Sequence, residues 1–219
     1  MAWIYDLLFV IVFAFAAVSS WRKGFLASLA ELVGTVVAAG VAIFASSTLA
    51  GPVYETFLSG SVSAKVESAV AQSGGDLAAA VQGMEFLPAT VRETLSTMVQ
   101  GAGSVLPEQI TTALQPILLP FVQVLLFVVL CLVLRWIFRL VVGLLCHVNS
   151  VPLVGGINRA LGLVLGLGVG ALDCWVLAML LWFLASVTLG TVDFLTMGIL
   201  KQSVGYGIFS AYNPFLTHY

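Results

Sequence analysis

Charged side chains are scarce in this sequence. Asp, Glu, Lys and Arg make up 8% of its 219 residues, and 61% of the residues are hydrophobic. A soluble globular domain carries roughly 25% charged residues, because polar groups must cover its apolar interior. So few charges exclude a soluble fold, and the mean hydropathy of +1.12 agrees. We therefore expect lipid to surround most of the chain.

Chemically reactive residues are few as well. The three cysteines, Cys131, Cys146 and Cys174, are widely spaced in or beside apolar runs, so they fit neither a disulfide framework nor a zinc site. We expect them to be small buried residues in helix packing. No nucleophile, base or metal-ligand set converges, so the sequence predicts no cofactor, no metal and no enzyme. A net charge of −2 without a basic tract argues against nucleic acid as a partner.

Four apolar runs are long enough to cross a bilayer, which takes about 20 residues. They cover residues 4–20, 25–46, 117–145 and 160–187. An uncleaved span is favoured over a signal peptide for the first run, because Asp6 precedes its uninterrupted part and Arg22 and Lys23 follow it. Helix is predicted for all four, since backbone groups in lipid must bond within their own segment. The predicted fold class is an all-α membrane protein, with a four-span domain over residues 1–187.

The placement of Lys and Arg predicts the orientation. Five of the eight basic residues lie on one side of the membrane. Arg22 and Lys23 belong to the turn after the first span, and Arg135, Arg139 and Arg159 bound the connection between spans three and four. The long loop between spans two and three, residues 47–116, holds two basic and six acidic residues, a net charge of −4. The positive-inside rule therefore places both turns in the cytoplasm, and both termini and the long loop outside. We expect two helical hairpins in tandem, each with a basic cytoplasmic turn.

Two segments lie outside the predicted spans. The long loop carries apolar residues at helical spacing, such as Val62, Val66 and Val70, which predicts two or three amphipathic helices on the membrane or on the bundle. A packed but inert linker is the open alternative. The tail, residues 188–219, contains Asp193 and turn signals, so we expect a short outer interfacial helix rather than a fifth span.

Small residues recur every four positions in two of the spans. The rows are Gly162, Gly166 and Gly170 in the fourth span and Ala30, Gly34, Ala38 and Ala42 in the second. Residues four apart share a helix face, and small ones let two helix backbones approach closely. The rows predict tight helix packing, either within the chain or with a second copy in a homo-oligomer.

Four ionisable residues fall inside the spans, namely Glu31, Arg135, Arg139 and Asp173. A charge at mid-membrane costs about 2.5–3.5 kcal/mol on insertion scales, so such residues usually pair or line water. Depth along each helix suggests the pairs Glu31–Arg139 and Asp173–Arg135. The alternative is that the arginines and Glu31 reach the cytoplasmic interface, and this is favoured for Arg139 and Glu31. Asp173 is too short to do so, and it is either protonated or hydrogen-bonded, or on an ion or proton path.

Two motifs in this order resemble a known family. The first runs from Ile4-Tyr5-Asp6-Leu7-Leu8 through an apolar span to the turn Trp21-Arg22-Lys23-Gly24-Phe25-Leu26. The second is the approach to the last span, where Asn158 and Arg159 precede Gly162 and Gly166. An early aspartate, a basic turn with glycine, and this Asn-Arg-x-x-Gly-x-x-x-Gly pattern resemble the colicin V production protein family.

The resemblance implies a small bacterial inner-membrane protein linked to colicin V production. We expect an accessory or scaffold in toxin or bacteriocin production, export or envelope maintenance, whose outer loop meets other membrane or envelope proteins. The alternative is a small channel or transporter with Asp173 and Arg135 on its path. Some family relatives carry a trypsin-like protease domain, an activity that we do not expect here.

Overall fold

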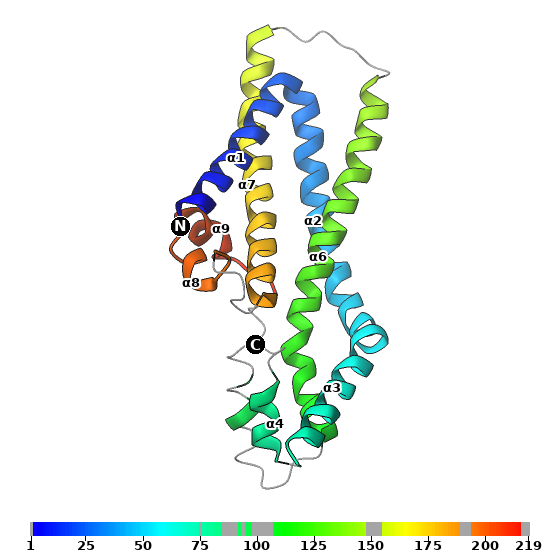
Figure 1. The fold of residues 1–219 in the computed structure, drawn as a ribbon. Coiled ribbons are helices and arrows are strands. Elements are labelled where there is room, and N and C mark those ends of the chain that lie inside the picture. Colours follow the sequence, from blue (N-terminus) through cyan, green and yellow to red (C-terminus); the bar gives the residue numbers. More distant parts are fainter. Residues whose placement is uncertain are drawn as a thin grey trace.

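The computed structural model describes residues 2–74, 76–84, 92, 95–97, 107–147, 155–188 and 194–215. The regular structure in these ranges is helical throughout, and four of the helices are long and apolar enough to cross a membrane (Figure 1). The prediction of an all-α fold with four helices long and apolar enough to cross a membrane is therefore confirmed. The connection 148–154, the loop residues 85–91 and 98–106, and Asp193 and His218 lie outside the described residues.

The four long helices extend beyond the predicted apolar runs. They are α1 (Trp3–Lys23), α2 (Phe25–Val53), α6 (Pro107–His147) and α7 (Gly155–Val187). Only Gly24 separates α1 from α2. Its φ of 82° lies in the left-handed region, which glycine adopts at little cost, and this lets the chain reverse within one residue.

Helix continues where the sequence predicted the long loop to begin, at residue 47. The chain runs from α2 through the π-helical segment η1 (Tyr54–Leu58) into α3 (Ser59–Gln72). The hydroxyls of Ser46 and Thr48 donate to carbonyls one turn back, so both are hydrogen-bonded within the helix. Pro52 lacks an N–H, and the wider π turn directly after it absorbs the interruption.

The helix α6 is too long for a bilayer. Its 41 residues span about 60 Å, twice the ~30 Å of the hydrocarbon core, and they include Pro116 and Pro120. Its first turns lie beside α3 and α4 (Leu77–Gly83) at the end opposite the α1–α2 turn (Figure 1). Buried apolar side chains join these segments, and we call this part the head. They are Val62, Val66, Val81, Met84, Leu95 and Leu114.

Each of the first two long helices packs mainly against one of the last two. The main neighbour of α1 is α7 and that of α2 is α6, while α2 also contacts α7. The backbones of α6 and α7 approach each other less closely, and long side chains bridge them, such as the stacked rings of Phe121 and Trp182 with centroids 5.3 Å apart. Part of their interface is filled by Phe215 of the tail, whose ring centroid lies 5.4 Å from that of Phe127 on α6. The Trp175 indole on α7 donates to the Tyr212 carbonyl at 2.8 Å and holds the tail there.

The tail forms two short helices, α8 (Met197–Leu200) and α9 (Val204–Ser210). Both are far shorter than the 18 residues of a candidate span. Asp6 of α1 accepts hydrogen bonds from the Ser203 hydroxyl at 2.7 Å and the Gly205 amide at 2.9 Å, at the start of α9. Tyr5 donates to the Phe194 carbonyl at 2.6 Å. The beginning of α1 therefore anchors the tail.

Both rows of small residues pack inside the chain. A Cβ added at Gly162 or Gly166 would lie 2.7 or 2.5 Å from atoms of Ser20 on α1, and Gly170 faces the same helix. In α2, Gly34 contacts the Phe138 side chain of α6. The rest of the α2 row consists of the fully buried Ala38 and Ala42 and the half-buried Ala30. The glycines thus let α1 and α7 touch backbone to backbone.

We predict that Gly162→Ala destabilises the folded protein by about 1–3 kcal/mol, because the new methyl group must push α1 away from α7. Titration with SDS in mixed micelles, followed by circular dichroism, measures this. Gly40→Ala is the matched control, since a Cβ there would meet nothing within 4 Å. The control should be neutral or slightly stabilising, because alanine favours helix over glycine. Equal losses in the two variants would contradict the close approach.

Candidate functional site: an ion-pair cluster among three helices

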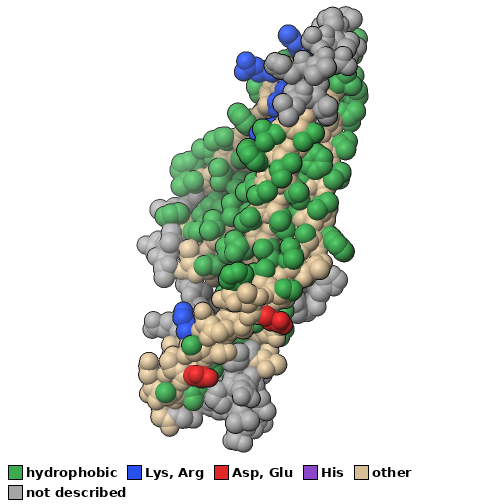
Figure 2. Space-filling view, turned by 90° about the vertical axis from the view of Figure 1, so that its right-hand side faces the viewer, with side chains coloured by type: hydrophobic (Ala, Val, Ile, Leu, Met, Phe, Trp, Pro, Cys, Tyr) green, Lys and Arg blue, Asp and Glu red, His purple; other side chains and the backbone are tan. Residues whose placement is uncertain are grey.

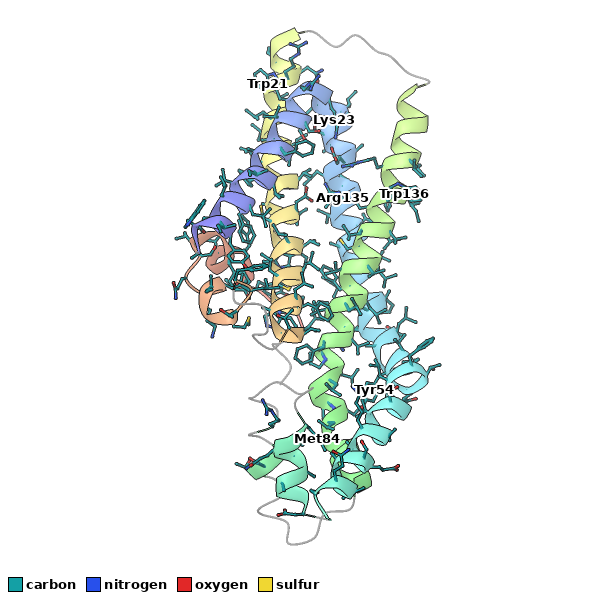
Figure 3. The ribbon with its side chains drawn as sticks, in the orientation of Figure 1. Trp21, Lys23, Tyr54, Met84, Arg135 and Trp136 are labelled. Carbon is teal, nitrogen blue, oxygen red and sulfur yellow. The ribbon has the colours of Figure 1, made fainter. Side chains whose placement is uncertain are left out.

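The ionisable residues of the spans meet where α2, α6 and α7 adjoin. Arg139 of α6 donates to Glu31 of α2, with 2.9 Å between Nη2 and Oε1. Arg135 of α6 donates to Asp173 of α7, with 3.0 Å between Nη2 and Oδ2, and its Nη1 forms a second ion pair there. Figure 3 shows Arg135 directed into the bundle between α6 and α7. Both pairings suggested by depth along the helices are present.

Lys23, predicted only as part of the cytoplasmic turn, also belongs to this site. Its Nζ lies 2.7 Å from Glu31 Oε2. Arg135 Nη2 lies 3.9 Å from Glu31 Oε1. Cations therefore face both oxygens of Glu31. The signal for Lys23 is weak in the sequence, because the Gly24 turn lies between Lys23 and Glu31 and breaks the helical spacing.

The exposure of these side chains divides them into an inner and an outer set. Relative exposure is 15% for Glu31, 18% for Asp173 and 21% for Arg135, against 38% for Lys23 and 63% for Arg139. Arg139 extends outward while it bonds Glu31, whereas the Glu31 carboxylate is mostly covered. The expectation that both side chains reach the cytoplasmic interface stays a prediction.

These ion pairs form one connected group, which we call the charge cluster, and each carboxylate in it faces cations. Its members are Lys23, Glu31, Arg135, Arg139 and Asp173. Three cations and two carboxylates leave a formal charge of +1. A charge in an apolar surrounding is tolerated when an opposite charge with hydrogen bonds compensates it. The cluster therefore links α2, α6 and α7 to one another and to the end of α1.

The two motifs behind the family resemblance touch each other. The Asn158 side chain on α7 accepts a hydrogen bond from the Phe25 amide at 2.8 Å, across 133 residues of sequence. It thereby satisfies an N–H at the start of α2 that has no partner within its own helix. A Cβ at Gly24 would lie 2.6 Å from Asn158 Nδ2, so this position requires glycine for space as well as for its φ. Arg22 and Arg159 are exposed beside this contact.

The described cysteines pack between the helices and take no part in the ion pairs. Within the described part of the chain, no group of three or more His, Cys, Asp and Glu side chains could hold a metal ion. Cys174 donates to the Phe9 carbonyl from within the α1–α7 interface, away from the carboxylates. Cys131 is buried in the core between α2, α6 and α7. The side chains of Cys146 and His147 lie outside the described set.

Comparison with known proteins yields no match to any family model, curated protein or solved structure. The resemblance to the colicin V production family therefore stays a prediction that rests on the motifs above.

We predict a strong energetic coupling between Arg135 and Asp173. Asp173→Asn leaves Arg135 without its main counter-charge, so it should destabilise the fold. Adding Arg135→Gln should then cost less than it does alone, with a coupling energy of about 1–3 kcal/mol. SDS titration of the double-mutant cycle measures this. Arg22→Gln, on the exposed turn, is the control, and its effect should add to that of Asp173→Asn. Additive effects of both partner substitutions would contradict the ion pair.

Proposed function

We propose that the chain is a multi-pass protein of the bacterial inner membrane, of the colicin V production type. It acts as a scaffold or accessory in toxin or bacteriocin production, in export or in envelope maintenance. In this proposal the basic turns lie in the cytoplasm, and both termini and the head lie outside. The order of the sequence motifs supports the family, and the contact between Gly24 and Asn158 gives both motifs a common structural role.

The charge distribution supports the orientation. Figure 2 shows a broad band of hydrophobic side chains, with Lys and Arg side chains gathered at one end. Acidic as well as basic side chains lie beyond the other end (Figure 2). Exposed arginines at the α1–α2 turn and at the start of α7 mark the basic end, which the positive-inside rule assigns to the cytoplasm.

The pairing within the charge cluster is the observation that carries the scaffold proposal. Glu31 and Asp173, the two carboxylates inside the spans, each face an arginine of α6. A scaffold needs charges that hold helices in place, and this arrangement suits that role. The head supplies the second feature of a scaffold, because continuous helices carry it beyond the apolar band and it has an apolar core of its own.

A channel or transporter is the second candidate. It is favoured by one observation, namely that Arg135 and Asp173 retain 21% and 18% exposure deep within apolar helices. Paired ionisable residues at such a position mark ion or proton paths in many membrane proteins. In that case Asp173 would carry the path.

Flux measurement separates the two proposals. We predict that proteoliposomes containing the native protein show no ion or proton flux above empty liposomes, because the carboxylates are used in ion pairs. Asp173→Asn should change the stability and leave this result as it is. Flux in the native protein that disappears in Asp173→Asn would reject the scaffold in favour of a transporter with Asp173 on its path.

We further predict that the head contacts other envelope proteins. A photo-crosslinking residue placed at Glu67, exposed on α3, should form specific crosslinks to protein in intact cells. The matched control is Phe44, which is 74% exposed on the apolar part of α2 and should face lipid. Crosslinks at neither position, or equally at both, would contradict a partner-binding head.

A further inference from the structure

Two cations of the charge cluster remain open to the surroundings of the bundle. Arg139 is 63% exposed and Lys23 is 38% exposed, although each bonds Glu31. A guanidinium has five N–H donors and an ammonium has three. The hydrogen bond to Glu31 uses one N–H of each side chain, so each keeps further donors for a ligand. Glu31 thus holds two partly exposed cations, one on each of its oxygens.

Charge counting gives the kind of ligand that fits. Arg135 and Asp173 balance each other, which leaves Lys23, Arg139 and Glu31 with a formal charge of +1. One phosphate group with a single negative charge would neutralise this set. Charge-assisted hydrogen bonds from arginine and lysine are the usual way in which proteins hold phosphate.

An exposed apolar stripe continues from Arg139 into the membrane band. Leu125, Val129, Leu132 and Trp136 precede Arg139 at intervals of three and four residues, so all five share one face of α6. Each of the four apolar residues is at least 44% exposed. The stripe is about 21 Å long at 1.5 Å per residue, which is comparable to an extended acyl chain. Figure 3 shows Trp136 pointing away from the bundle.

Aromatic residues mark the depth of this site. Trp136 is 63% exposed and Trp21, in the turn that contains Lys23, is 41% exposed. Exposed tryptophans concentrate at the level of lipid headgroups. Arg139 lies eight residues before the end of α6, about 12 Å along the helix, so a long side chain can reach that level.

We propose that Lys23 and Arg139 bind the anionic headgroup of a phospholipid, with Glu31 holding the two cations in position. The phosphate lies between the two cations, and an acyl chain follows the stripe from Trp136 to Leu125. The ligand is a lipid rather than a free anion, because the site combines a single positive charge with a long apolar face. This inference does not depend on the scaffold proposal, since a transporter could hold the same lipid.

Native mass spectrometry of the full-length protein in detergent tests the proposal. Phosphatidylglycerol and phosphatidylcholine are titrated separately, and the lipid-bound fraction is measured. The native protein should bind phosphatidylglycerol at least about fivefold more tightly, as expected when one basic residue contacts an anionic headgroup. Arg139→Gln should remove most of this preference, and Arg139→Lys should retain part of it.

A control variant distinguishes a specific lipid site from general electrostatic attraction between the basic turn and anionic lipid. Arg22→Gln removes one positive charge from the same turn at an exposed arginine, and it should leave the preference unchanged. Lys23→Gln is the second test variant, because Glu31 keeps its bond to Arg139 when Lys23 is absent. Circular dichroism of each variant shows whether the fold is intact.

Three outcomes would overturn the proposal. They are equal binding of the two lipids by the native protein, equal losses in Arg22→Gln and Arg139→Gln, and displacement of bound phosphatidylglycerol by millimolar glycerol phosphate. The last would show that the cations take a free phosphate and that the apolar stripe contributes nothing.

Discussion

The arrangement of this bundle depends on the need to compensate charges inside an apolar band. Glu31, Asp173 and Arg135 lie in helices that otherwise present hydrophobic side chains, and each would be costly there alone. Compensation requires the charged residues of α2, α6 and α7 to lie at the same depth. It also requires each helix to be rotated about its axis so that its charge faces the others. Hydrophobic contacts do not impose this, because lipid tails satisfy apolar side chains as well as a neighbouring helix does. The ion pairs therefore select one register among several that packing would allow.

The close approach of the α1 and α7 backbones complements these ion pairs. The glycine row of α7 brings Ser20 of α1 within contact distance, and Asn158 then reaches the first amide of α2. One helix thus fixes both arms of the α1–α2 turn. Lys23, at the end of α1, is held where it can bond Glu31, so the glycine packing and the ion pairs depend on the same turn.

Much of this could be predicted from the sequence, and the limits have physical causes. Hydropathy indicates the four helices because lipid selects for long apolar runs, and depth counting indicates the pairs of Arg135 and Arg139 because a helix rises regularly. The packing of α1 against α7 and the bond from Asp6 to Ser203 join distant segments, which leave no local pattern. Residue 47 was predicted to begin the loop because the apolar run ends at Ser46, whereas the helix continues beyond it and through a π turn after Pro52. The orientation and the colicin V production resemblance stay predictions.

Continuous helices fix the distance and the orientation of the head relative to the membrane-spanning part. Arg139 lies near one end of α6 and Leu114, in the core of the head, lies on the same helix about 38 Å away at ~1.5 Å per residue. A flexible loop would let the head sample many positions, but α2, η1 and α3 form a second continuous support alongside. Because these two helical supports pack together, they restrict the rotation of the head as well as its distance from the charge cluster. A partner bound to the head would therefore be held at a defined height and angle above the bilayer, which is the physical requirement for a scaffold.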